Sequence, residues 1–107
     1  MVQHTGGRMR FKEVKIKNKF IVELDQWFYE DCEEWQDSSV TEFKDTDKNR
    51  EIIEKLLEID KDVEADLEEQ LKYLKKHLDV ADNIENFGDI HITYYDKDGK
   101  QYEVLND

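Results

Sequence analysis

Residues 47–84, DKNREIIEKLLEIDKDVEADLEEQLKYLKKHLDVADNI, decide the fold of this chain. The stretch contains neither Gly nor Pro, and its apolar residues recur about every 3.6 positions, which is the repeat of a straight amphipathic helix. The members of this stripe are Ile52, Leu56, Ile59, Val63, Leu67, Leu71, Leu74, Leu78, Ala81 and Ile84. A helical region is therefore expected at the centre of the chain.

The length of this region raises the question of whether the helix is continuous. One straight helix would measure about 55 Å, because each residue adds ~1.5 Å, whereas a compact domain of this size has a radius of gyration of about 13 Å. Either the helix breaks near Asp60-Lys61-Asp62, where Asp62 can cap a second helix, or one long helix protrudes and pairs with another chain. The steady repeat favours continuity, and compactness favours the break.

The middle of the helical region is strongly acidic, and Lys61 is the only base between residues 58 and 69. On a helix these carboxylates form two ridges that flank the apolar stripe. One ridge consists of Glu58, Asp62, Asp66 and Glu69, and the other of Asp60, Glu64 and Glu68. Their axial spacing of about 2.5 Å lies between the charge spacing of one DNA strand and that of a duplex. A solvated helix face is the alternative interpretation.

Length and composition indicate one small globular domain. The chain has 107 residues, of which 37% are hydrophobic and 41% charged, and its net charge is −12. Such a charge disfavours direct binding of nucleic acid and favours a basic protein partner. The single cysteine, Cys32, excludes an internal disulfide, and no apolar run is long enough for a signal peptide or a membrane span. We therefore expect a cytoplasmic protein with no membrane association.

The N-terminal part of the chain is basic. Residues 1–8 have little to anchor them, so we expect a flexible tail followed by a single α+β domain over residues 9–107. Residues 1–19 carry a net charge of +5, which leaves −17 for residues 20–107. Alternation of apolar residues predicts a hairpin with a turn at residues 17–19, in which Val14 faces Val22 and Ile16 faces Phe20. Its basic residues would protect an exposed strand edge or neutralise the acidic helix.

Residues 25–37 read as a short helix, because Leu24, Phe28, Cys32 and Trp35 follow one another at steps of four, four and three. This segment carries a second acidic block, which consists of Glu30, Asp31, Glu33 and Glu34. We expect Trp35 in the core and Cys32 to be a small buried residue rather than a nucleophile. Residues 39–42 have the spacing of a capping box, so a turn of helix is expected there.

The C-terminal part predicts a second hairpin. Ile90, Ile92 and Tyr94 alternate before a turn at residues 97–99, and a three-residue loop with Gly99 in the left-handed conformation pairs Tyr94 with Tyr102. The expected fold is therefore α+β, with two β-hairpins joined in one four-stranded antiparallel sheet that flanks a central helical region with one long or broken helix. Its core face would include Val14, Ile16, Val22, Ile92, Tyr94 and Val104.

No catalytic, metal-binding or nucleotide-binding motif accompanies this pattern. We find no nucleophile–base pair and no glycine-rich phosphate loop, and the three histidines lie far apart in the sequence. Alignment of residues 94–105 with a calcium-binding loop places Tyr94 and Leu105 at ligand positions, so the calcium interpretation fails. We expect no enzyme activity, no metal site and no cofactor.

Two function classes remain. The first is a non-catalytic acidic protein that binds and inhibits a basic protein partner, such as a nucleic-acid-processing enzyme, by nucleic-acid mimicry through the two ridges or the second acidic block. In composition alone the chain resembles phage anti-restriction and anti-CRISPR proteins and nuclease immunity proteins. The alternative is a structural or regulatory interaction module that forms a homodimer through the long helix.

Overall fold

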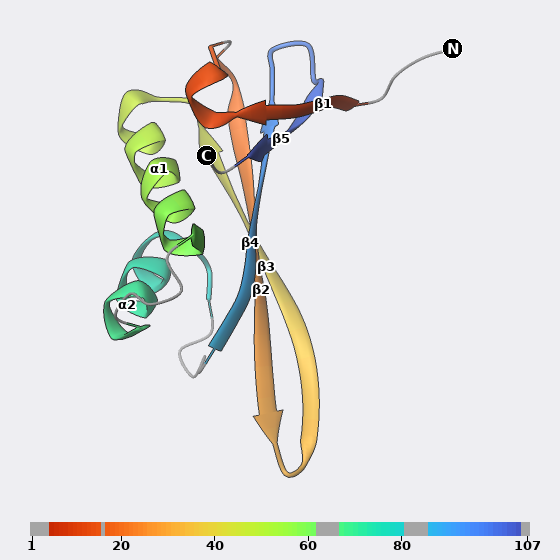
Figure 1. Ribbon diagram of the computed structural model, residues 1–107, viewed down its shortest axis with the longest axis vertical. Helices are drawn as coiled ribbons and strands as arrows, with labels where there is room; N and C mark the ends of the chain where they lie inside the picture. The colour runs from red at the N-terminus through yellow and green to blue at the C-terminus, as the bar shows by residue number, and fades with distance from the viewer. Residues whose placement is uncertain (1–4, 16, 62–66, 81–85, 106–107) are drawn as a thin grey trace.

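The computed structural model describes residues 5–15, 17–61, 67–80 and 86–105, which form a five-stranded mixed sheet and two α-helices (Figure 1). In chain order the elements are β1 (Thr5–Arg10), the 3-10 helix η1 (Phe11–Glu13), β2 (Lys19–Glu30), β3 (Glu33–Lys44), α1 (Asp47–Lys61), α2 (Leu67–His77), β4 (Asn86–Tyr95) and β5 (Gln101–Leu105). The α+β class is confirmed. The four-stranded antiparallel sheet is wrong, because a fifth strand adds a parallel pair.

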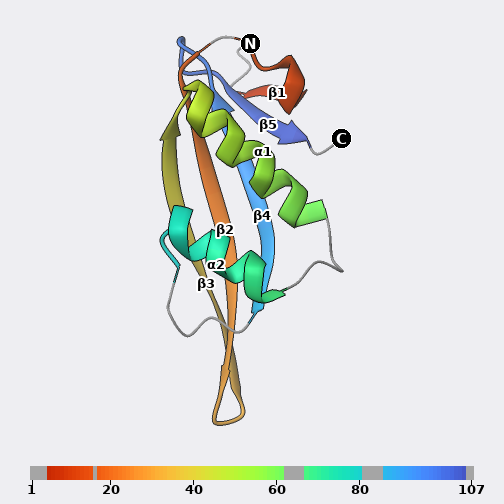
Figure 2. The ribbon, with the colours of Figure 1, turned by 90° about the vertical axis from the view of Figure 1, so that its left-hand side faces the viewer.

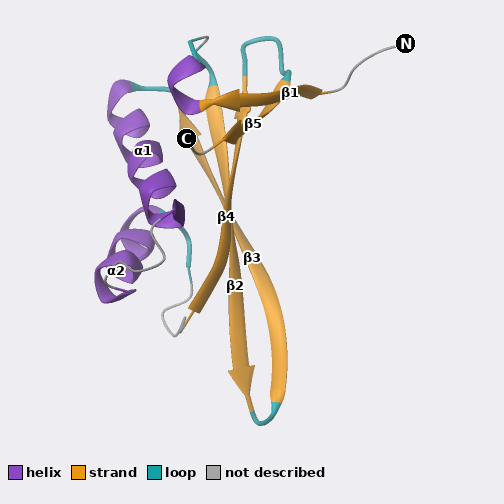
Figure 3. Cartoon of the chain, viewed as in Figure 1, coloured by secondary structure: helices purple, strands orange, loops and turns teal. Residues whose placement is uncertain are grey.

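The strands lie in the order β1-β5-β4-β2-β3, with β1 parallel to β5 and the other pairs antiparallel. Both helices cover the same face of this sheet, and the opposite face carries no helix among the described residues (Figure 3). Side chains alternate accordingly along β2, where Phe20, Val22 and Leu24 are fully buried on the helix side. The intervening residues, such as Glu23 and Asp25, belong to the face without helices.

The helical region consists of two helices rather than one, and both lie across the sheet (Figure 2). The predicted break near Asp60-Lys61-Asp62 falls at the end of α1, and residues 62–66 lie outside the described residues. The backbone N–H of Asn49 donates to Thr46 Oγ1 at 3.1 Å, so Thr46 caps the start of α1. The whole molecule extends 48 Å along its longest axis, less than a single helix of residues 47–84 would require.

The core lies between the helices and the sheet. From the predicted stripe, Leu56 and Leu74 are fully buried, and Ile59 and Leu78 nearly so. They belong to one cluster with the inward side chains of the strands. The predicted core residues Val14, Val22, Ile92, Tyr94 and Val104 are all buried, which confirms them, and Ile16 lies outside the described residues.

The predicted N-terminal hairpin is wrong. Residues 5–10 form β1, which pairs in parallel with β5, and the chain then turns through η1, where the Val14 N–H donates to the Phe11 carbonyl at 3.1 Å. Half of the expected tail is therefore paired in the sheet, while residues 1–4 lie outside the described residues. Local alternation contains no information about a partner strand some ninety residues away. Arg8 does lie on an outer strand, where it forms an ion pair with Glu103 at 3.2 Å.

The helix predicted over residues 25–37 is also wrong, because β2 and β3 form a long antiparallel hairpin there. Trp35 is 39% exposed and Cys32 is exposed, so neither is the core residue we expected. The expected helical turn at residues 39–42 lies within β3 instead. Steps of three and four residues over a short segment do not distinguish a helix from a strand, and the Trp, Phe and Tyr side chains here favour strands.

The C-terminal hairpin agrees with the sequence prediction. Tyr94 pairs with Tyr102, and the Asp96 N–H donates to the Lys100 carbonyl at 3.1 Å, which closes a three-residue loop. Gly99 has a φ of 81°, the left-handed conformation that the register requires. Inside the turn, Asp96 Oδ1 accepts the N–H groups of Asp98 and Lys100, and these bonds hold the pKa of Asp96 below its ordinary value despite its burial.

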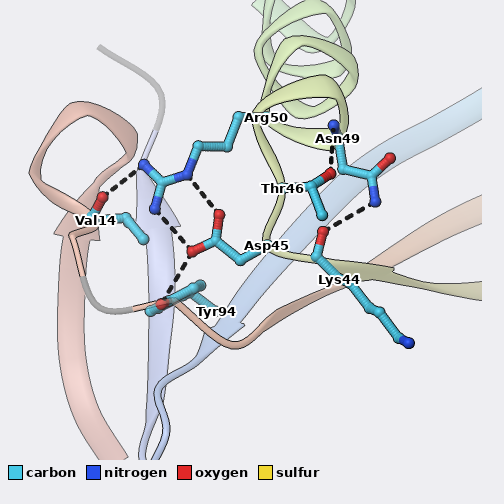
Figure 4. A network of polar contacts seen from close by, with 7 residues as sticks. All are labelled: Val14, Lys44, Asp45, Thr46, Asn49, Arg50 and Tyr94. Carbon is cyan, nitrogen blue, oxygen red and sulfur yellow. Dashed lines mark hydrogen bonds and ion pairs between the residues drawn. The ribbon is translucent and has the colours of Figure 1, made fainter.

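A polar network joins α1 and β4 to the segments that follow β3 and η1 (Figure 4). The Asp45 side chain is fully buried and accepts two hydrogen bonds from the Arg50 guanidinium, at 2.5 and 2.7 Å. Arg50 also donates to the Val14 carbonyl at 2.7 Å, and Tyr94 Oη donates to Asp45 at 3.3 Å. Burial and the adjacent Asp45 carboxylate raise the pKa of Tyr94 to about 12, so the phenol stays protonated and remains a donor.

Candidate functional site

The most prominent surface feature is the β2–β3 ribbon, which we define as residues 27–37. Strand β4 pairs with β2 only as far as Trp27↔Asn86, so the outer part of the hairpin projects beyond the rest of the sheet as a two-stranded ribbon (Figures 1 and 2). Asp31 and Cys32 close it with φ values of 52° and 65°, as in a two-residue type I′ turn, whose twist matches that of the strands. The ribbon is therefore a regular, defined projection.

The ribbon carries exposed negative charge. Asp31, Glu33, Glu34 and Asp37 are all exposed, and Glu30 ends β2 beside the turn. None of the ion pairs found between described residues involves these four exposed carboxylates, and residues 20–43 contain no base. The second acidic block predicted from the sequence is thus brought together on one projecting element, although on a strand hairpin rather than on a helix.

Two tryptophans lie on the same ribbon. Trp27 and Trp35 are 40% and 39% exposed, a large exposure for residues of this size. The indole of Trp27 lies against Gly88 of β4, where an added Cβ would come within 2.6 Å of Trp27 Nε1. Gly88 thereby makes room for the ring, which stays partly open to solvent. Tryptophan is enriched among the residues that contribute most of the binding energy at protein interfaces.

The outer edge of the ribbon is also unpaired. β3 is the last strand of the sheet, and among the described residues no strand pairs with its outer side. The Asp45 N–H donates to the Asn18 carbonyl at 2.8 Å, so the odd-numbered amides of β3 point toward β2. The even-numbered amides of Glu34, Gln36, Ser38 and Val40 therefore point outward, as a ready template for an additional strand.

A group of titratable side chains lies at the root of the ribbon, on the face of the sheet without helices. One ligand atom each of Asp25, Asp89 and His91 can be chosen so that all three lie within 4.8 Å of one another. His91 Nε2 lies 3.4 Å from Asp25 Oδ2, and Ser38 Oγ donates to Asp25 Oδ1 at 2.8 Å. The sequence alone does not indicate this group, because Asp25 is separated from the other two residues by more than sixty positions and only the β2–β4 register brings them together.

The helix ridges are less coherent than the sequence suggested. Glu58 is exposed and lies 3.6 Å from Lys55, while Glu68 and Glu69 are exposed in the first turn of α2. Asp62, Glu64 and Asp66 lie outside the described residues. Among the described members of the predicted ridges, no row of carboxylates runs continuously from α1 to α2.

Asp60 has a structural contact that the sequence did not indicate. Its Oδ1 accepts the Ile90 N–H at 3.2 Å, at the edge of β4 that the short strand β5 leaves unpaired. A groove of about 460 Å³ lies at this edge, lined among others by Leu57, Asp60, Ile92 and Leu105. Because Asp60 is half-buried and occupies an edge amide, we assign it to the protection of the β4 edge rather than to an open acidic surface.

No family model, curated protein or solved structure matches this chain. Within the described residues, neither helix combines the length and the apolar character needed to cross a membrane.

Proposed function

We propose that the chain is a non-catalytic binding protein that docks its acidic β2–β3 ribbon against a basic surface of a partner protein and blocks that surface. The observation that supports this most is the projecting ribbon itself, which combines four exposed carboxylates with two half-exposed tryptophans. Charge steers the encounter with a basic partner, and the indoles supply contact area that charge alone does not.

The spacing of the carboxylates on the ribbon can be compared with the spacing of phosphates in a nucleic acid. Asp31 in the turn and Glu33, Glu34 and Asp37 in β3 span at most about 20 Å at ~3.3 Å per residue, so neighbouring carboxylates are on average roughly 7 Å apart along the ribbon. One DNA strand carries a phosphate every ~3.4 Å, so the ribbon is less densely charged than a nucleic acid. We therefore propose that the ribbon occupies the basic groove of a nucleic-acid-processing enzyme because it is negatively charged and projects from the sheet. The tryptophans contribute part of the affinity.

The outer edge of β3 is the part of the ribbon that a partner strand can bind. Its outward amides allow a basic extended segment of the partner to pair with β3 and to place its cations beside Glu34 and Asp37. Self-pairing of two β3 edges would instead bring like charges together, since β3 carries four carboxylates and one lysine. The alternative function, a homodimer through the long helix, is less well supported because the stripe residues Leu56, Ile59, Leu74 and Leu78 are buried in the core of this chain.

Two triple variants with equal charge change test the proposal. The ribbon variant carries Glu33→Gln, Glu34→Gln and Asp37→Asn, and the ridge variant carries Glu58→Gln, Glu68→Gln and Glu69→Gln; all six residues are exposed. The basic partner is captured from the native lysate on immobilised wild type, purified, and titrated by surface plasmon resonance. We expect the ribbon variant to lose at least tenfold in affinity at low salt, mainly in the association rate, with a smaller loss at high salt.

The ridge variant is the control, and we expect its affinity to stay within about threefold of wild type. If the ridge variant loses affinity and the ribbon variant does not, the helix face is the binding surface and the proposal is wrong. Equal losses in both variants would show that only net charge matters, which also contradicts a defined ribbon site.

A further inference from the structure

The group formed by Asp25, Asp89 and His91 lies where β2 and β4 cease to pair regularly. Leu24 pairs with Ile90 and Gln26 with Phe87, so β4 contains one extra residue and both Gly88 and Asp89 lie opposite Asp25. This is a β-bulge, a feature that redirects side chains and often lies beside binding sites. A Cβ on Gly88 would meet Asp25 Cβ at 3.5 Å, so the bulge brings the β4 backbone close to Asp25.

The side chains of this group are those that ligate transition metals. Two carboxylates and one imidazole make up a three-residue ligand set, which leaves the fourth position of a tetrahedral zinc ion to water. Ligand atoms in a tetrahedral zinc site are separated by about 3.4 Å, given bonds of ~2.0–2.1 Å. His91 Nε2 and Asp25 Oδ2 are already 3.4 Å apart, and the exposed Asp89 has to move by a side-chain rotation to complete the site.

We propose that Asp25, Asp89 and His91 bind one divalent transition-metal ion, of which Zn²⁺ is the representative. The imidazole nitrogen favours Zn²⁺, Ni²⁺ or Co²⁺ over Mg²⁺ and Ca²⁺, which prefer oxygen ligands. The ion links β2 to β4 at the root of the ribbon. It also offsets the repulsion among the carboxylates of Asp25, Asp89 and Glu23, the last of which is the cross-strand neighbour of His91. This proposal stands independently of the proposed function and differs from the absence of a metal site expected from the sequence.

Zinc binding is measured by isothermal titration calorimetry with ZnCl₂ on the full chain carrying Cys32→Ser, because the exposed thiol of Cys32 is a competing ligand. We expect one saturable site. Asp25→Asn, Asp89→Asn and His91→Ala are each expected to weaken Zn²⁺ binding at least tenfold, whereas Glu54→Gln, which removes an equal charge from the exposed face of α1, should leave it unchanged. Circular dichroism of each variant verifies that the fold is kept.

Fluorescence supplies a second readout because the Trp27 indole lies beside this group. In a Trp35→Phe background, Co²⁺ is expected to quench Trp27 emission with saturation at one equivalent, and His91→Ala should abolish this. The proposal is wrong if Zn²⁺ binding is not saturable, if it survives His91→Ala, if Glu54→Gln weakens it as much as Asp25→Asn, or if equimolar Mg²⁺ displaces Zn²⁺.

Discussion

Replacement of Asp45 by alanine is expected to lower the free energy of unfolding by about 3–5 kcal/mol, the range for removal of one partner from a buried ion pair. Asp45 is fully buried and is the acceptor for both Arg50 and Tyr94 (Figure 4). Its loss leaves the guanidinium, which is only 25% exposed, without its carboxylate in the junction between β3 and α1. Urea unfolding followed by circular dichroism measures the change.

A double variant separates the ion pair from the packing around it. Asp45→Leu combined with Arg50→Met removes both charges and retains apolar volume, so it should recover a large part of the stability lost in Asp45→Ala. A cost below about 1 kcal/mol for Asp45→Ala would show that the network in the folded protein is looser than these distances indicate.

Ile92→Ala is the second change with a large expected effect. Ile92 is 4% exposed, pairs with the fully buried Val22, and belongs to the core beneath the helices. The lost transfer free energy and the cavity left behind should together cost about 2–5 kcal/mol. Reversible unfolding in urea, with the same slope against denaturant as wild type, is the measurement.

Val40→Ala is the matched control for Ile92→Ala, because Val40 also lies in the sheet but is 58% exposed. Its truncation should cost less than about 0.5 kcal/mol, as expected for a surface site. If Ile92→Ala proved equally mild, the helix-covered face of the sheet would not be the core.

The parts of the fold that were predictable from sequence are the local ones. The C-terminal hairpin combines strict alternation with a glycine at the position that needs a left-handed backbone, and both signals lie within sixteen residues of sequence. The helical repeat likewise located α1 and α2.

The wrong predictions concern the N-terminal strand and residues 25–37. The parallel pair of β1 and β5 joins the two ends of the chain, and no local pattern in residues 5–10 indicates it. The helix predicted over residues 25–37 is wrong for a different reason. Phe28, Cys32 and Trp35 follow a helical repeat, but the segment forms two strands around a two-residue turn. Asp31 tolerates the left-handed conformation of that turn, but the sequence lacks the Asn-Gly or Asp-Gly pair that marks it most clearly.

In the candidate site, too, the local features were predictable from the sequence and the features that depend on strand pairing were not. The acidic block at residues 30–34 was visible in the sequence, but its projection on a ribbon, with Trp27 and Trp35 beside it, depends on strand pairing. Asp60 shows that a position within a predicted acidic ridge can serve as a backbone hydrogen-bond acceptor instead. The proximity of Asp25 to His91 is likewise a consequence of register alone.

Residue-resolved amide hydrogen exchange, measured by NMR on the protein alone and in complex with its captured basic partner, tests the role of the ribbon most directly. The odd-numbered amides of β3 already donate to β2, so we expect new protection at the outward amides of Glu34, Gln36, Ser38 and Val40 when the partner binds. Protection confined to α1 and α2, with unchanged exchange along the ribbon, would contradict it.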